Sequence, residues 1–111
     1  MSATVDVVEG RILLPADLAA AYFAEVEAVV VLIDPDRISV LPVRHMAAGG
    51  CLLKQRNMAG DRVAAAPDVF RHVGLGAWQG KGLPALWSEA DGALQIALPE
   101  AAKLIYISQK Q

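Results

Sequence analysis

Cysteine is almost absent from the chain, and the one present, Cys51, has no second thiol with which to form an internal disulfide. A domain of 111 residues buries enough surface to fold without disulfides or structural metals. A lone thiol is also compatible with a reducing compartment. We therefore expect a single domain over residues 1–111 and a cytoplasmic location.

Long hydrophobic runs are lacking as well. The longest, from Ala28 to Ile33, is far shorter than the roughly 20 apolar residues that cross a bilayer. The N-terminal segment carries acidic residues where a secretory signal would carry basic ones. The sequence therefore predicts neither a membrane span nor a targeting segment.

Aromatic residues are scarce, at 5% of the chain, while hydrophobic residues make up 55%. This composition predicts a core of Ala, Val and Leu with a few larger anchors such as Trp78 and Trp87. Apolar side chains that one small domain leaves uncovered are often buried by self-association. We therefore expect a homo-oligomer.

The chain has no surplus of positive charge, since ten basic side chains stand against twelve acidic ones for a net charge of −2. Domains that bind nucleic acids usually show the opposite balance, because phosphates attract lysine and arginine. A DNA interface on this chain must therefore depend on a local basic patch.

What the sequence does contain is an alternation of strand and helix signals. β-Branched, alternating residues predict strands over Thr4–Val8 and Ile12–Leu14. Pro15 then opens a helix of about three turns that reaches Val26. Residues 28–42 follow as a hairpin of two core strands across an Asp-Pro-Asp turn.

The same order of elements recurs in the second half. Extended segments over Cys51–Arg56 and Arg62–Ala65 precede a helix that begins at Pro67 and ends before Gly74. A glycine-rich loop, Gly76–Gly82, then leads to the last two strands. This order predicts a duplicated unit.

Residues repeat along with the elements. The segment GRILLPADL holds Arg11 six positions before Asp17, and DRVAAAPDV holds Arg62 six positions before Asp68. From the arginine to the Leu-Pro pair that closes each half, the spacing is 31 positions in the first half and 37 in the second. We place the six extra residues in the glycine-rich loop.

One such unit of about 45 residues cannot close a hydrophobic core alone, whereas two units can pair their strands into a closed barrel without exposed edges. We therefore expect an α+β, β-rich barrel with pseudo-repeats at about 4–43 and 51–99. Residues 100–111 form a C-terminal tail, in which Leu104 to Ile107 fit one more strand or an interface segment.

The second half, GDRVAAAPDVFRHVGL, is similar to the second repeat of the MraZ branch of the AbrB-like swapped-hairpin proteins, with its arginine, apolar strand, proline, helix and closing Gly-Leu. The resemblance covers most of residues 4–99. It implies a swapped-hairpin barrel, assembly into homo-oligomers and transcriptional regulation. It also implies that Arg11 and Arg62 contact DNA, each after its turn.

The turn motifs depart from the family pattern. The family usually has an aspartate three residues before the glycine of its Gly-Arg pair, and Val7 occupies that place here. In the second copy Asp61 stands at the glycine place and Met58 at the aspartate place. These departures weaken the implied DNA contacts more than the implied fold.

Lys54 and Arg56 supply the local basic patch that a DNA interface needs. They alternate on a predicted strand and so face the same side, and arginine can clamp phosphate or read guanine. We therefore add both to Arg11 and Arg62 as candidate DNA contacts. The alternative is a solvated strand face whose cations form salt bridges with Asp61 and Glu25.

No catalytic, metal or cofactor signature stands out. Cys51 beside His45 is the only sequence-local candidate for nucleophilic catalysis, and a cysteine at the start of an apolar strand is more often buried and inert. No histidines or cysteines show close metal-ligand spacing, and the glycine-rich loop fits no phosphate-binding motif. We expect neither an enzyme nor a bound metal or cofactor.

Two functions stay open on the sequence alone. The first is an oligomeric DNA-binding transcriptional regulator, which the duplicated unit and its arginines favour. The second is a non-DNA-binding accessory or protein-interaction subunit that uses the same barrel and contacts another protein through the loop carrying Trp78. The negative net charge and the altered turns favour the second function.

Overall fold

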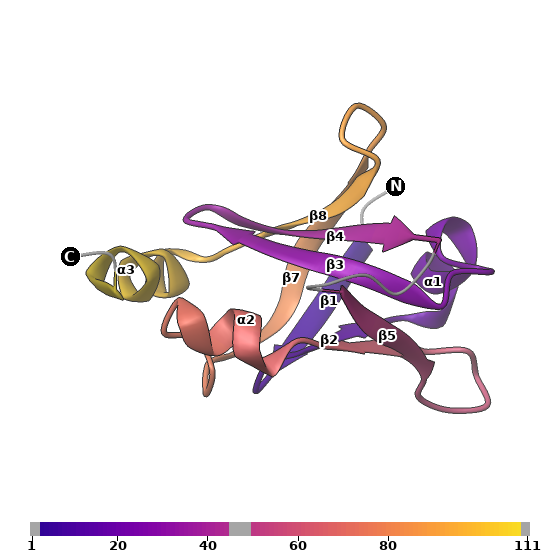
Figure 1. Ribbon diagram of the computed structural model, residues 1–111, viewed down its shortest axis with the longest axis horizontal. Coiled ribbons are helices and arrows are strands. Elements are labelled where there is room, and N and C mark those ends of the chain that lie inside the picture. The colour runs from indigo at the N-terminus through magenta and orange to yellow at the C-terminus, as the bar shows by residue number, and fades with distance from the viewer. Residues whose placement is uncertain (1–2, 45–49, 110–111) are drawn as a thin grey trace.

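The described part of the chain folds as a closed barrel of eight antiparallel strands with three short helices (Figure 1). The computed structural model describes residues 3–44 and 50–109. The strands are β1 (Ala3–Val8), β2 (Arg11–Leu14), β3 (Ala28–Asp34), β4 (Arg37–Val43), β5 (Gly50–Gln55), β6 (Arg62–Ala65), β7 (Gln79–Ser88) and β8 (Ala93–Ala97). The helices are α1 (Ala16–Tyr22), α2 (Pro67–His72) and α3 (Glu100–Gln109). The predicted β-rich barrel is thereby confirmed.

Strands that are distant in sequence close the barrel. Around it the order is β1-β2-β6-β5-β3-β4-β8-β7, with β7 paired back onto β1. Sequence neighbours form the hairpins β1–β2, β3–β4, β5–β6 and β7–β8. The remaining pairs are β1–β7, β2–β6, β3–β5 and β4–β8, and each joins the first half of the chain to the second. The two halves therefore share one sheet and one core.

Small aliphatic side chains fill the interior of the barrel, as the composition predicts. Along β1, for example, Val5 and Val7 point inward and are at most 2% exposed. The largest fully buried side chains are Phe23 and Phe70, and the two tryptophans pack against the core from its border. No polar or charged side chain is buried among the described residues. The hydrophobic effect therefore supplies most of the stability of the fold.

Helix α1 is shorter than the spacing of its apolar residues predicts. It starts after Pro15, whose extended backbone forms the N-cap, and it ends at Tyr22 after two turns. Phe23 then takes a non-helical conformation and buries its whole side chain in the core, which turns the chain toward β3. Val26 consequently lies beyond the helix, and its assignment to the helix was wrong.

Helix α2 begins and ends at the residues that the sequence predicts. Pro67 occupies the first turn, where its missing N–H costs nothing. Gly74 adopts a φ of +81° directly after the C-cap residue Val73, as helix-terminating glycines do. Phe70 is the residue of this helix that fills the core.

A hairpin turn from each half rests on the start of the helix in the other half. The Gly10 carbonyl accepts the Ala66 N–H at 2.9 Å, and a Cβ on Gly10 would lie 2.7 Å from the Cα of Pro67. The backbone of Gly10, at φ +80°, also favours glycine. On the other side, Oδ1 of Asp61 accepts the Ala16 N–H at 2.8 Å. These reciprocal contacts fix both helices to the barrel.

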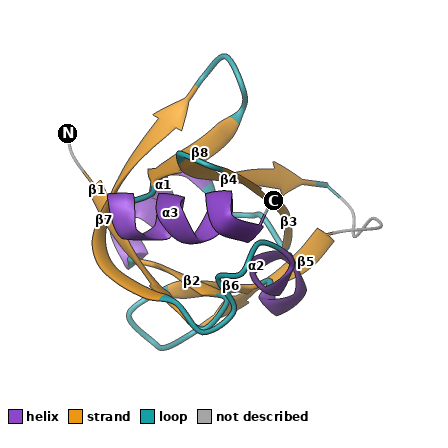
Figure 2. Cartoon of the chain, turned by 90° about the vertical axis from the view of Figure 1, so that its left-hand side faces the viewer, coloured by secondary structure: helices purple, strands orange, loops and turns teal. Residues whose placement is uncertain are grey.

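Two segments differ from the sequence prediction. Strand β7 begins at Gln79, so the second part of Gly76–Gly82 is strand rather than loop. The tail forms helix α3 instead of one more strand, because Ala102 and Tyr106, four positions apart, bury one helical face against the core. Figure 2 shows α3 lying across one end of the barrel. None of the described helices is long and apolar enough to cross a bilayer.

Candidate nucleic-acid interface

Arg11 lies on the outer face of the barrel. It opens β2 opposite Ala65, and it alternates with Ile12, whose side chain is fully buried inside. The guanidinium is exposed and makes no hydrogen bond or ion pair with the described residues. This predicted contact residue is therefore free to meet an external anion.

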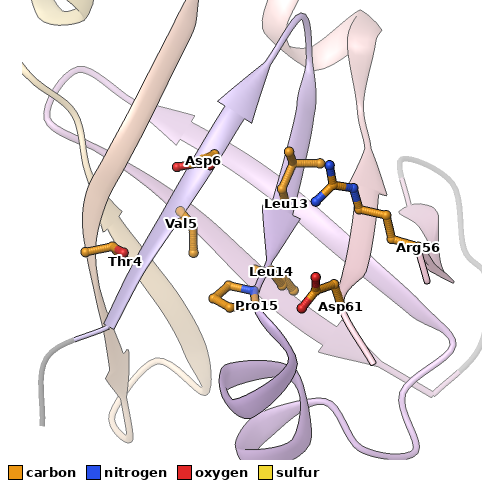
Figure 3. Close-up of a pocket in the computed structure, with 8 residues that line it drawn as sticks. All are labelled: Thr4, Val5, Asp6, Leu13, Leu14, Pro15, Arg56 and Asp61. Carbon is orange, nitrogen blue, oxygen red and sulfur yellow. The ribbon is translucent and has the colours of Figure 1, made fainter. Parts of the chain in front are cut away.

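Lys54 and Arg56 share that outer face. Lys54 pairs with Val63 of β6, which in turn pairs with Leu13 of β2, so these three side chains form one row across the wall. Arg56 follows β5 directly, and its guanidinium extends toward Leu13 (Figure 3). Both cations are exposed and neither has an ion-pair partner among the described residues.

Arg11, Lys54 and Arg56 therefore form one basic surface on β2, β6 and β5, which we call the basic wall. Arg11 and Lys54 are two strands apart, or roughly 10 Å across the sheet. Cations at this spacing on a solvent-facing wall can reach separate phosphates of a nucleic-acid backbone.

Two carboxylates lie beside this wall: Asp6 is paired with Leu13 of β2, and Asp61 interacts electrostatically with Arg56. Hydrogen bonds from the Asn57 side chain and the Ala16 N–H, together with the positive charge of Arg56, lower the pKa of Asp61. The carboxylate therefore stays ionised at neutral pH and offsets part of the charge of Arg56. The predicted pairing of the basic patch with Asp61 is thus an electrostatic attraction to Arg56 rather than a close ion pair.

Arg62 is placed differently from the other three candidates. Its guanidinium donates hydrogen bonds to the carbonyls of Phe23, Val26 and Leu53 at 2.7, 2.6 and 2.7 Å. The side chain is half-buried and lies on the same face of β6 as Ala64, which is fully buried. Arg62 therefore ties the end of α1, the segment before β3 and strand β5 together inside the barrel.

The two arginines that define the predicted repeat consequently face opposite sides of the wall. Arg11 is paired with Ala65 on the outside, whereas Arg62 is paired with Leu14 on the inside. The sequence could not show this difference, because residues 63–65 are all apolar and give no alternation from which to read the inward side. An alignment of the two halves that superimposes Arg11 on Arg62 therefore matches an outward-facing position with an inward-facing one.

Trp78 makes its main contacts within the chain. It is half-buried and packs against the core, and its ring covers Gly80 so closely that a Cβ there would lie 2.5 Å from Cη2 of the indole. Glycine at position 80 is what leaves room for the ring. The predicted protein-contact residue therefore exposes only part of its surface.

Sequence reasoning missed a second aromatic feature. The rings of Tyr22 and Trp87 stack with centroids 4.8 Å apart and planes 7° from parallel, and Phe23 meets Trp87 edge-on at 6.1 Å. Trp87 lies 65 positions after Tyr22 and 64 after Phe23, so only the barrel topology brings it against them.

The candidates for catalysis do not assemble into a site. Cys51 is half-buried and burial raises the pKa of its thiol, which disfavours the nucleophilic thiolate. His45 lies outside the described residues. Within residues 3–44 and 50–109, no three His, Cys, Asp or Glu side chains are grouped as metal ligands.

Comparison of the chain with family models, with curated proteins and with solved structures finds no match. A proposal for the function must therefore be based on the barrel and on the basic wall.

Proposed function

We propose that the protein is an oligomeric DNA-binding regulator of the AbrB-like type that holds the phosphate backbone through Arg11, Lys54 and Arg56. The observation that carries the proposal is that these three exposed cations share one outer wall and have no ion-pair partner among the described residues. Unpaired cations on one surface release counterions when they meet phosphates, and this release drives DNA binding.

The proposal assigns Arg62 to the fold and not to DNA. Its guanidinium is already committed to three carbonyls, so a phosphate would have to compete with them. Of the two DNA contacts that the family resemblance implies, the proposal keeps only Arg11, which lies on the same outer wall as Lys54 and Arg56. A cytoplasmic setting fits this role, since it gives access to DNA and keeps Cys51 reduced.

The proposal includes a duplicated, swapped-hairpin origin for the barrel. It is supported by the exchange of strands, in which β1 pairs with β7 of the other half and β5 pairs with β3. Buried positions also match at a constant separation of 52 residues: Ile12 with Ala64, Leu14 with Ala66, Leu18 with Phe70, and Phe23 with Leu75. In this alignment the counterpart of Arg62 is Gly10, so the first unit has no inward-facing arginine at the matching position.

The extra length of the second unit is then spread over more than one turn. In the β3–β4 hairpin the turn between the paired residues Asp34 and Arg37 contains two residues. In the β7–β8 hairpin the turn between Ser88 and Ala93 contains four. At a separation of 52 the second unit is five residues longer, since the closing Pro42 and Pro99 are 57 positions apart, and the glycine-rich segment before β7 does not hold all of these extra residues.

Retention on mixed DNA at about 50 mM and 200 mM salt tests the proposal, because phosphate contacts lose most of their affinity over this range. Replacing Arg11, Lys54 and Arg56 together by alanine should weaken retention strongly at low salt and flatten the salt slope by about 3. The matched control replaces Arg37, Arg44 and Lys81, which are equally exposed cations elsewhere. Absence of retention at both salt concentrations would refute DNA binding.

A second candidate function is supported by an apolar area on the outside of the barrel. Leu32 of β3 and Leu52 of β5 are 51% and 50% exposed, and half-buried Val30 and Leu41 face each other between β3 and β4. An accessory or protein-interaction subunit would bury this surface against a partner, and a homo-oligomer would bury it against a second copy. A Leu32→Asp and Leu52→Asp double variant should then lower the mass measured by light scattering.

A further inference from the structure

A groove runs beside α1 on the side of the barrel formed by β1 and β7. Its main hollow, about 450 Å³, is lined by Asp17, Leu18 and Tyr22 of α1 and by Leu86 and Trp87 of β7. A second hollow of about 280 Å³, shown in Figure 3, adjoins it, since Thr4 and Pro15 line both. We call the two hollows together the α1 groove.

The main hollow contains a rigid aromatic platform. Tyr22 stacks on Trp87 at 4.8 Å, and the edge contact of Phe23 with Trp87 fixes the pair from the core side. Tyr22 is nevertheless 41% exposed, and neighbouring Leu86 is 67% exposed. Flat aromatic surface that is held in place and open to solvent costs a ligand little ordering entropy.

The charge of the α1 groove is opposite to that of the basic wall. Asp17 is exposed and has no hydrogen-bond or ion-pair partner among the described residues. Asp6 and Asp61 line the adjoining hollow, where Arg56 is the one cation among the lining residues. A phosphate backbone would be repelled here, whereas a cationic side chain would be attracted.

We propose that the α1 groove binds an extended peptide segment that carries an arginine. The guanidinium packs on the Tyr22–Trp87 platform and its charge is balanced by Asp17, while apolar neighbours in the peptide cover Leu18 and Leu86. Arginine fits better than lysine because its planar group both stacks on aromatic rings and pairs with carboxylates. The arginine site lies in the main hollow, whose lining contains neither a cation nor a residue of the basic wall, so it does not depend on DNA binding.

The direct test measures the affinity of a short labelled peptide of alanine and leucine with one central arginine, by fluorescence anisotropy. We expect a Kd of about 10–100 µM, about tenfold weaker binding when lysine replaces arginine, and no binding when glutamate does. In a Trp78→Phe background, the emission of Trp87 should change on binding. Equal binding of the arginine and glutamate peptides would overturn the proposal.

Matched variants locate the site. Asp17→Asn should weaken binding of the arginine peptide about tenfold, since it removes one charge from the groove without altering the helix. Asp68→Asn is the control, because Asp68 is a 90% exposed carboxylate in the first turn of α2 and away from the groove. If both variants bind like the unmodified protein, or if both weaken equally, the peptide does not bind in the α1 groove.

Discussion

Replacing Arg62 by alanine separates the role that the structure gives this residue from the role that the family resemblance implies. In the structure its guanidinium bridges the carbonyls of Phe23, Val26 and Leu53, which belong to three segments of the barrel. The Arg62→Ala variant leaves all three carbonyls without this donor. The expected result is a loss of stability rather than a specific loss of DNA binding.

The size of the effect follows from the number and setting of the hydrogen bonds. A hydrogen bond to a charged group contributes about 1.5–3 kcal/mol, and an unpaired buried carbonyl costs about 1–3 kcal/mol. Arg62 is only half-buried and lines a hollow of about 440 Å³, so water can replace part of what is lost. We therefore expect a loss of about 2–4 kcal/mol, which lowers the Tm by roughly 10–25 °C in a domain of this size.

Urea unfolding followed by circular dichroism measures this loss, with an unchanged m-value as the sign that both end states are intact. Arg11→Ala is the matched control and should stay within about 0.5 kcal/mol of the unmodified protein, because its side chain has no partner within the described chain. Arg62→Lys should recover only part of the stability, since an ammonium has a single nitrogen in place of the two, Nη1 and Nη2, that reach the three carbonyls. Equal stabilities of the Arg62→Ala and Arg11→Ala proteins would refute the reasoning.

Three further predictions concern other parts of the barrel. Gly10→Ala should cost about 3 kcal/mol in chemical unfolding, because the new Cβ would lie 2.7 Å from Pro67, whereas Gly92→Ala, at φ +60° with nothing within 4 Å, should cost only about 1 kcal/mol. Because the pKa of Asp61 is lower in the folded protein, the ionised carboxylate stabilises the fold. This stabilisation is complete above the pKa of the unfolded chain, near about pH 4, and is lost as the pH falls through the lower pKa of the folded protein. An Asp61→Asn protein should therefore show a weaker acid dependence of its Tm, and an unchanged dependence would contradict the assignment. Cys51, whose pKa burial raises, should react with iodoacetamide at pH 8 more slowly in the folded protein than in urea, and equal rates would show that the thiol is accessible.

The sequence predicts the barrel well where turn residues and proline mark the ends of elements. Strand β6 begins and ends at Arg62 and Ala65 as expected, and α2 lies between Pro67 and Gly74. The tail is less well defined in sequence, because the apolar run Leu104–Ile107 fits either a strand or a helix. Contacts of Ala102 and Tyr106 with the finished barrel select the helix, and this information is absent from the local pattern.

The candidate site is also predictable from the sequence only in part. The shared face of Lys54 and Arg56 follows from strand alternation, and the register between β2, β6 and β5 adds Arg11 to it. The inward position of Arg62 depends on the register of β6 against β2, which the apolar run of residues 63–65 leaves unspecified in sequence. The stacking of Tyr22 on Trp87 depends on barrel closure, and no local sequence motif predicts it.

The pairing of β1 with β7 also dictates when this protein can fold during its synthesis. Thr4 has its strand partner at Pro84, so during synthesis β1 waits for a segment about 80 residues later in the chain. At about 5–20 residues per second this delay lasts roughly 4–16 s, during which the edge of β1 that pairs with β7 has no partner. Long-range pairing of this kind also slows folding in vitro. A nascent chain stalled before β7 should therefore be protease-sensitive and in need of a chaperone.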